Sequence, residues 1–386
     1  MKRQLAFFEF FLLGLLSISL GKEILGQDLS IPMTTSDRVL SKGWWPTKAT
    51  EPRDQFVGSE TCAGCHKQIA ETQGTTAMSH ALRSARSDKS DAGGPWSLRM
   101  GPYSYQIART QDGISYSASD GSRTVTAPLA WVFGSGHFGQ TYVYEQKGVF
   151  YESHLSYFQG IRGLDLTTGH RQMKVPDLDH SLGVAQPPDT IRGCFGCHTT
   201  ASTTAGHFDP AHLIAGISCE ACHGPGAQHV AAMSMGKGEQ TATLIMNPAT
   251  LPPPESVDFC GACHRTTLDT IEMRLTGVLN IRFPAYRLQT SRCWGSAGDP
   301  RLTCMACHDP HVPLVTTSAS YDQNCLSCHA NSAASKPSPD HPGKACPVGQ
   351  KECTSCHMPK YEIKEMHADF TDHKIAIHRP GEPFTE

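Results

Sequence analysis

Alternating hydrophobic and polar positions mark one region of the chain, at about residues 96–160. Aspartate-glycine pairs at 112–113 and 120–121 interrupt it, and such pairs favour hairpin turns. We therefore expect a small antiparallel β meander, which serves either as a structural insert or as a docking module for a partner. Its strands are rich in aromatic and β-branched residues and are expected at Tyr103–Ile107, Ile114–Ser117, Leu129–Phe133, Thr141–Tyr144 and Val149–Tyr151.

A second pattern is an apolar run near the start of the chain. Leu5–Leu20 is apolar apart from Glu9 and two serines, and it follows Lys2 and Arg3. A basic start followed by a short apolar run is typical of a secretory signal, whereas a membrane span needs about 20 apolar residues. We expect residues 1–26 to be a cleaved signal peptide, with a membrane anchor as the alternative. Export would bring the protein into an oxidising compartment.

Fourteen of the 16 cysteines belong to one repeated motif, Cys-x-x-Cys-His, which occurs seven times. Two cysteines three positions apart on a helical turn project to the same side, so they can form thioethers with the two vinyl groups of one porphyrin. The histidine that follows supplies an axial ligand to the iron. A zinc ribbon, an iron–sulfur site or a disulfide framework does not need a histidine after every cysteine pair. The cysteines are Cys62, Cys65, Cys194, Cys197, Cys219, Cys222, Cys260, Cys263, Cys304, Cys307, Cys325, Cys328, Cys353 and Cys356, and the histidines are His66, His198, His223, His264, His308, His329 and His357.

The motifs predict seven covalently attached haem c groups, and composition agrees with them. Of the 386 residues only 18% are charged, and 35 glycines and 26 prolines favour loops. We expect a multihaem cytochrome c fold, mainly short α-helices and loops packed around a haem array, with the β meander as a small insert. The expected segments after the signal are a one-haem segment at 27–95, a haem-free β-rich insert at 96–186 and a six-haem cytochrome domain at 187–386.

Several elements of the chain resemble the cytochrome c-554 family of multihaem cytochromes. The resemblance implies closely packed haems, mostly with two histidine ligands, that carry electrons in the periplasm. The best-studied members carry four haems, so seven motifs are a departure from the family. The elements that carry the resemblance are Val57–Cys62, Met78–His80, Cys219–His229, Cys304–His311, Cys353–Lys360, His367 and Asp369–His373.

Thirteen histidines lie outside the motifs and are candidates for the second axial ligand of each iron. His311 follows His308 by three residues and cannot reach the opposite face of the same haem, so it should bind a neighbouring one. The same holds for His229 after His223. The candidates inside family-like elements are His80, His229, His311 and His373; His341 and His367 come next, and the seventh is one of His137, His170 and His207.

The chain has enough histidines to give each haem iron six ligands. This favours an electron carrier over an enzyme, since catalysis needs an open or exchangeable position on an iron. We expect a periplasmic or extracellular cytochrome that exchanges electrons with redox partner proteins, with any membrane contact made through them. A net charge of −3 argues against nucleic-acid binding. One alternative is an oxidoreductase with one open haem, acting on a small nitrogen or sulfur compound. Another is a subunit of an extracellular electron conduit or filament.

Two cysteines, Cys293 and Cys346, lie outside the motifs. In an exported protein the simplest account is one disulfide between them. The alternative is two buried thiols.

Overall fold

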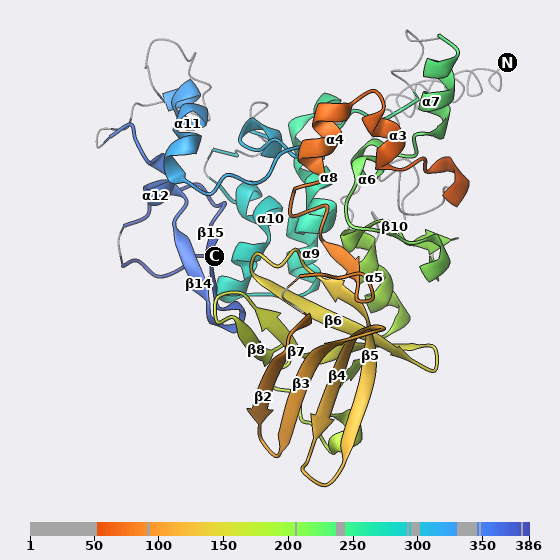
Figure 1. Cartoon of the computed structure of the whole chain (residues 1–386). Helices are drawn as coiled ribbons and strands as arrows, with labels where there is room; N and C mark the ends of the chain where they lie inside the picture. Colours follow the sequence, from red (N-terminus) through yellow and green to blue (C-terminus); the bar gives the residue numbers. More distant parts are fainter. Residues whose placement is uncertain are drawn as a thin grey trace, which may run out of the picture. The chain divides into compact units, whose positions relative to one another are not determined.

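In a computed structural model of the chain, the alternating region forms an antiparallel sheet of nine strands (Figure 1). Its main path runs in chain order, and the strands at its two ends, β2 and β8, are in contact, so the sheet nearly closes on itself. Two further strands extend it, because β1 (Leu82–Ser84) pairs with β5 and β9 (Gly183–Ala185) pairs with β7. The path consists of β2 (Trp96–Met100), β3 (Tyr103–Thr110), β4 (Gly113–Ser119), β5 (Thr124–Phe133), β6 (Gly139–Gln146), β7 (Val149–Phe158) and β8 (Gly163–Leu166).

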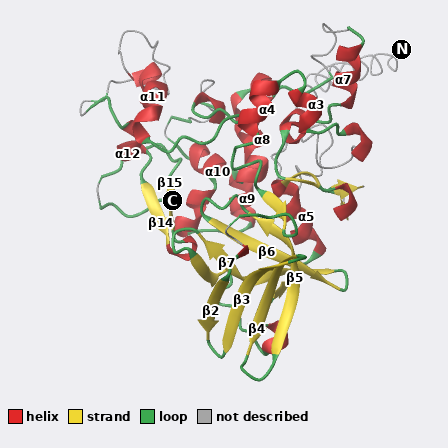
Figure 2. Cartoon of the chain, in the orientation of Figure 1, coloured by secondary structure: helices red, strands yellow, loops and turns green. Residues whose placement is uncertain are grey.

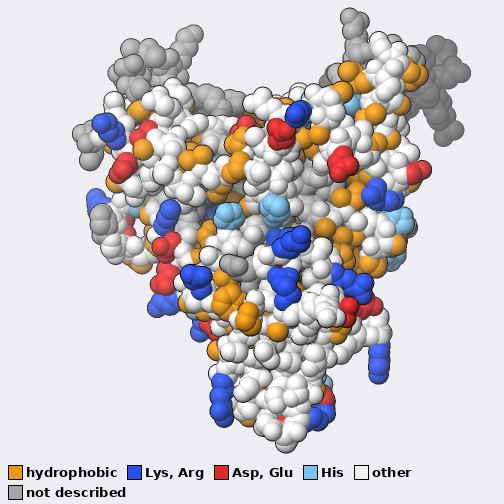
Figure 3. All heavy atoms as spheres, in the orientation of Figure 1, with side chains coloured by type: hydrophobic (Ala, Val, Ile, Leu, Met, Phe, Trp, Pro, Cys, Tyr) orange, Lys and Arg blue, Asp and Glu red, His pale blue; other side chains and the backbone are white. Residues whose placement is uncertain are grey.

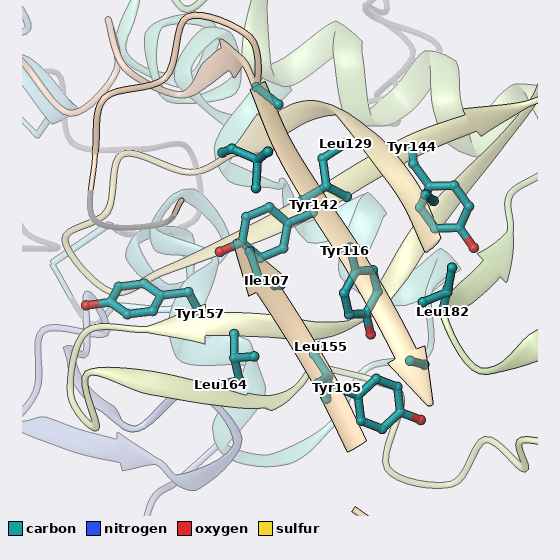
Figure 4. Packing of buried hydrophobic residues seen from close by; sticks show 14 of the residues in the cluster. Tyr105, Ile107, Tyr116, Leu129, Tyr142, Tyr144, Leu155, Tyr157, Leu164 and Leu182 are labelled. Carbon is teal, nitrogen blue, oxygen red and sulfur yellow. The ribbon is translucent and has the colours of Figure 1, made fainter. Parts of the chain in front are cut away.

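The inward side chains of this sheet form the largest hydrophobic cluster among the described residues. Four tyrosines, Tyr105, Tyr116, Tyr142 and Tyr157, are almost fully buried in it. Figure 4 shows these rings between the strands together with leucine and isoleucine side chains. Because successive side chains of a strand point to opposite faces, the alternation in the sequence becomes one apolar inner face. The sheet therefore has a core of its own.

The size of this sheet corrects the fold expected from the sequence. A mainly helical fold with a small β insert is wrong, since a nearly closed antiparallel sheet is the largest element and takes strands from both sides of the predicted meander. The predicted segments were three to five residues long, whereas β5 and β7 have ten residues each. In β7 the register shift against β6 falls between Glu152 and Ser156, directly after the predicted end at Tyr151. Such a bulge interrupts the alternation without ending the strand, so pattern alone shortens β7. The shift in β5, between Leu129 and Trp131, lies inside the predicted segment and does not explain the missed residues Thr124–Pro128.

The rest of the described chain consists of short helices and three two-stranded ladders, β10 with β13, β11 with β12 and β14 with β15. Figure 2 shows most of these helices beyond one end of the sheet. The α-helices are α3 (Ser59–Ala63), α4 (Lys67–Gln73), α5 (Pro188–His198), α6 (Cys219–His223), α7 (Ala227–Ser234), α8 (Pro253–His264), α9 (Thr267–Glu272), α10 (Pro284–Gln289), α11 (Asp322–His329) and α12 (Cys353–His357). The 3-10 helices are η2 (Arg53–Gln55), η4 (Leu178–His180), η5 (Pro210–His212), η7 (Pro248–Thr250), η8 (Gly277–Arg282), η9 (Cys304–Ala306), η10 (Ser318–Tyr321) and η11 (Lys364–Met366). The short strands are β10 (Thr199–Ala201), β11 (Thr203–Thr204), β12 (His207–Phe208), β13 (Ile214–Ala215), β14 (Lys360–Ile363) and β15 (Ala368–Thr371).

The structure describes residues 52–90, 93–204, 207–236, 244–291, 293–294, 302–329, 346, 349–379 and 381–386. All of them belong to one unit of contacts, residues 34–386, and the segment boundaries at 95 and 186 stay predictions. Both the predicted signal peptide and His341 lie outside the described residues. Among the helices in the described ranges, none has the length and hydrophobicity that a bilayer crossing requires.

Candidate haem sites

All seven motifs include a helix or a helical turn. Helices α5 and α8 are built alike, because each begins with proline in its first turn, carries an acidic residue next and ends at the motif histidine. Proline is pre-organised for a first helical turn, and the acidic side chain favours the positive end of the helix dipole. In motifs that lie on shorter helical turns, the backbone N–H of the histidine donates to the carbonyl of the first cysteine, at 2.8 Å for His66 and 2.9 Å for His308. This turn brings both thiols to one side.

Hydrogen bonds fix the tautomer of several histidines. A backbone carbonyl can only accept, so a histidine whose Nδ1 lies next to one holds its proton there and leaves the Nε2 lone pair available for a metal. Three motif histidines and one candidate distal ligand have this arrangement. The Nδ1–O distances are 3.0 Å for His198 to Ala81, 2.8 Å for His223 to Met246, 2.8 Å for His357 to Ala376 and 3.1 Å for His373 to Thr371.

Two pairs of imidazole rings lie close together at a similar spacing. The ring centroids of His223 and His311 are 6.1 Å apart, with the rings 13° from parallel. Those of His308 and His373 are 6.2 Å apart, with the rings tilted by 44°. Two imidazoles on opposite sides of one metal, each with its nitrogen about 2 Å from it, have centroids roughly 6 Å apart. Both pairs therefore have the spacing that a shared iron requires.

The electrostatics of the second pair favour the neutral imidazoles that bind iron. Burial and the nearby His264 lower the pKa of His308. Burial first, and then His308, lower the pKa of His373 to about 4. A histidine must be unprotonated at its ligating nitrogen, so these shifts suit a ligand.

The remaining predicted ligands have varied surroundings. His229 lies on α7, and its Nδ1 is buried without a hydrogen-bond partner among the described residues. His80 is exposed, and the next residue, Ala81, accepts a hydrogen bond from His198 Nδ1. His367 directs its Nε2 to the Asp165 carboxylate at 2.8 Å, which occupies the nitrogen that a haem would need.

Among the three candidates for the seventh ligand, the structure separates His170 from the others. His170 is buried, with Nδ1 3.2 Å from His154 Nδ1 and Nε2 3.3 Å from Glu152, so both of its nitrogens are engaged. His137 and His207 are exposed. Of the other motif histidines, His66 and His264 are exposed and His329 is half-buried.

The motifs contact one another, although they lie far apart in the sequence. Helix α3, which carries Cys62, contacts α6, which carries Cys219; α8 with Cys260 likewise contacts η9 with Cys304, and α11 with Cys325 contacts α12 with Cys353. Other contacts join these pairs. Cys222 of the third motif packs with Cys260 and Cys263 of the fourth against Phe259 and Ala262. Cys197 Sγ of the second motif lies 3.5 Å from the Ala262 carbonyl of the fourth, and Asn324, next to the sixth motif, donates to the Ala306 carbonyl of the fifth at 2.7 Å. The thiols that would carry the haems thus lie side by side.

Apolar side chains exposed around the motifs fit flat apolar cofactors. Figure 3, in the orientation of Figure 1, shows hydrophobic and histidine side chains at the surface of the molecule. A porphyrin has flat apolar faces on which such side chains would pack. Those that flank motif segments or candidate ligands in the sequence are Ile69, Met233, Met235, Ile271, Met273, Val312, Leu314, Val315 and Ile377. The residues present therefore fit haem.

Sequence reasoning missed two carboxylates that tie motif segments together. Glu220, inside the third motif, is buried and accepts hydrogen bonds from the backbone N–H groups of Val57, Gly58 and Gly226. Asp322, at the start of α11, accepts from the N–H of Cys353 at 2.8 Å, and these bonds lower the pKa of its carboxyl. A charged residue at a variable position of Cys-x-x-Cys-His was the one signal available for Glu220.

The two cysteines outside the motifs lie in different surroundings. Cys293 is half-buried and precedes the buried Trp294, whereas Cys346 is exposed. The disulfide between them stays a prediction.

Comparisons with known proteins agree with this geometry. The family described as cytochrome c554 and c-prime matches residues 163–224, which hold the second and third motifs. The multiheme cytochrome MtrA of Shewanella baltica is 26% identical over 186 residues, which cover 45% of this chain and 46% of that protein. The chain thus spans about half the length of the curated relative it matches.

A solved structure shares the fold. The crystal structure of the outer cell wall cytochrome OcwA aligns with a TM-score of 0.50 and 14% sequence identity, covering 83% of this chain and 79% of that one. At this identity the likeness concerns the fold alone. With the repeated motifs, the family match and the multiheme relative, it leads to one conclusion: this chain is a multihaem c-type cytochrome.

Proposed function

We propose that this cytochrome carries seven haem c groups, one on each motif, and transfers electrons through them with irons mostly held by two histidines. The observation that carries the proposal is the pair of imidazole spacings of 6.1 and 6.2 Å, one for His223 with His311 and one for His308 with His373. Iron that is six-coordinate in both oxidation states changes its ligands little on reduction, which suits electron transfer. Contacts between motif cysteines support electron exchange between neighbouring haems.

The two histidine pairs also assign the cross-ligation. His311 would bind the iron whose motif ends at His223, although His311 follows the motif that ends at His308. His373, near the C-terminus, would bind the iron of His308. Each such pair joins two segments through one iron, as the sequence predicted for His311. We keep His80, His229 and His341 as ligands of other irons.

A second function has a specific observation in its favour. His367 and His170 have their nitrogens engaged by carboxylates or a second histidine, so the described chain offers fewer free distal ligands than the sequence suggested. One haem with an open position would then remain, and the protein would be an oxidoreductase acting on a small nitrogen or sulfur compound. The electron carrier is the better supported of the two.

We place the protein outside the cytoplasm, in the periplasm or beyond. The apolar run before residue 27 supports export, and the similar structure belongs to a protein described as an outer cell wall cytochrome. Its partners would be redox proteins, and a place in an extracellular conduit or filament is a further form of the same function.

The test combines mass spectrometry with electron paramagnetic resonance of the ferric protein. The mass should exceed that of the processed polypeptide by seven haem units, and His311→Ala should convert one low-spin haem to high-spin while the haem count stays the same. His212→Ala is the matched control, because His212 is hydrogen-bonded to Asp209 at 2.6 Å and lies outside the proposed ligands. A mass increase of fewer than six haems, or an unchanged spectrum for His311→Ala, would contradict the proposal. A high-spin signal that binds nitrite in the unmodified protein would favour the oxidoreductase.

A further inference from the structure

The contacts between motifs do not follow the order of the motifs in the sequence. The first motif, at Cys62, contacts the third, at Cys219, through their helices α3 and α6, and Ser59 Oγ on α3 lies 3.7 Å from Cys219 Sγ. The second motif, at Cys194, lies between them in the sequence, and its His198 Nδ1 lies 3.0 Å from the Ala81 carbonyl. The segments are far enough apart along the chain, 157 residues from Cys62 to Cys219, that only the tertiary structure can decide this.

From the third motif onward the contacts form a continuous line. Cys222 packs with Cys260 and Cys263 of the fourth motif in one hydrophobic cluster. Helix α8, which carries Cys260, then contacts η9, which carries Cys304 of the fifth motif. The fifth contacts the sixth through Asn324 and the Ala306 carbonyl. The sixth contacts the seventh through helices α11 and α12 and through Asp322, which accepts a hydrogen bond from the Cys353 N–H.

The second motif lies beside this line. Its helix α5 contacts α8, and Cys197 Sγ lies 3.5 Å from the Ala262 carbonyl inside the fourth motif. Strand β10, directly after His198, contacts α6 of the third motif, and Thr200 Oγ1 lies 3.0 Å from Ser218 Oγ. Helix α5 also packs against the sheet, where Phe195 and Ile191 meet Leu82 and Phe133, and Cys194 packs against the same cluster. The second motif is thus enclosed between the line and the sheet.

We infer that the haem array is a line with a side position, and not a line in sequence order. The line runs through the motifs at Cys62, Cys219, Cys260, Cys304, Cys325 and Cys353, and the haem at Cys194 is a branch held against the sheet. A thioether joins each cysteine to the edge of its haem, so contacting cysteines bring two haem edges together. This inference rests on the proposed electron-transfer function and names its route. Electrons would then cross between the haems of the first and the seventh motif without visiting that of the second, which would serve as a third access point.

The test measures electron transfer from the first haem to the seventh in variants that lack one haem. A photoreductant is attached to Glu71→Cys on α4, close to the first motif, where the side chain of Glu71 is 65% exposed. All variants that are compared also carry His357→Met, which marks the seventh haem. Methionine ligation raises the reduction potential of this haem and changes its spectrum, so it acts as a trap that collects the electrons, and its reduction can be followed separately. Two double variants are compared: Cys194→Ala with Cys197→Ala, and Cys260→Ala with Cys263→Ala. Mass spectrometry confirms six haems in each.

We expect the protein without the second haem to keep the fast reduction of the trap, and the protein without the fourth haem to lose it. Loss of the fast phase on removal of the second haem would overturn the inference, since a line in sequence order must pass through it. A trap that stays oxidised in the protein with all seven haems would contradict the proposed function instead. If a double variant does not load six haems, His198→Ala and His264→Ala, which keep both thioethers, repeat the comparison.

Discussion

A buried pair of histidines in the sheet shows how one contact sets a protonation state. His154 and His170 are each 3% exposed, and their Nδ1 atoms lie 3.2 Å apart. Only one of the two Nδ1 atoms can hold a proton in this contact. Burial, and then the charge that His170 would carry, lower the pKa of His154 below its ordinary value of 6.5, although the His180 backbone and Glu152 partly oppose the shift. Burial therefore favours the neutral form of His154 in the folded protein.

This pair predicts a loss of stability in acid. A histidine whose pKa is lowered by folding binds more protons in the unfolded chain, so the free energy of unfolding falls as the pH drops below about 6.5 and stays constant above it. His154→Phe should reduce this slope, and denaturant unfolding at several pH values, followed by circular dichroism, measures it. His180→Phe, at a side chain that is 67% exposed, is the control. An equal slope in all three proteins would argue against the buried pair as its source.

A buried ion pair joins α10 to the C-terminal segment. The side chains of Arg287 and Asp372 are fully buried and make two hydrogen bonds, at 2.8 and 2.7 Å. Removing one partner leaves an uncompensated buried charge, which costs about 3–5 kcal/mol. Arg287→Met should lower the free energy of unfolding by that amount, measured by denaturant titration. The double variant Arg287→Met with Asp372→Leu should recover much of the loss; a double variant that is less stable than the single one would contradict this account.

At the scale of elements, one carboxylate holds the start of the described chain against α6. The Glu220 oxygens accept from Val57 and Gly58 at 2.9 Å and from Gly226 at 2.8 Å. The last N–H belongs to the residue directly before α7, so three segments meet at one side chain. Because Glu220 lies between the two cysteines of its motif, this contact also positions the first motif against the third.

Glu220→Gln removes the charge and one acceptor oxygen. Hydrogen bonds to a charged group contribute about 1.5–3 kcal/mol, and a buried N–H left without a partner costs about as much. We expect faster amide hydrogen exchange at Val57 and Gly58, with the sheet unaffected. Hydrogen-exchange mass spectrometry measures it, and Glu60→Gln, at an exposed position, is the control. Equal exchange in the two variants would show that the carboxylate does not hold this segment.

At the scale of the whole molecule, haem loading should make a nearly neutral polypeptide strongly anionic. The chain has 33 basic and 36 acidic residues, a net charge of −3. A ferric haem with two histidine ligands and two ionised propionates adds about one negative charge, so seven bring the total to roughly −10 before any processing. Electron exchange with a basic redox protein should therefore slow as salt rises, because exposed charges are screened within about 10 Å at 0.1 M. Stopped-flow rates measured at increasing ionic strength test this; a rate independent of salt would count against charge-steered docking.

The sequence by itself determined the chemistry that is local. Two cysteines and a histidine within five positions form one helical turn, so the attachment sites at Cys219 and Cys304 could be identified without any fold. The strands around Tyr105 and Tyr142 were also recognisable, since alternation is a property of neighbouring residues. The extent of the strands was not recognisable: in β7 a bulge interrupts the pattern while the ladder continues, and the contact of β2 with β8 depends on how the whole sheet curves.

Only the tertiary structure decided which distant groups meet. His311 faces His223 and His373 faces His308 across 88 and 65 residues of chain, and Asp165 reaches His367 across 202. The sequence ranked His311 and His373 ahead of His367, but it could not say which group each of them would meet. What separates them is the partner that the folded chain brings within reach: another imidazole at the spacing of a shared iron, or a carboxylate that occupies the nitrogen. The same reason places Cys62 beside Cys219 and leaves Cys194 against the sheet.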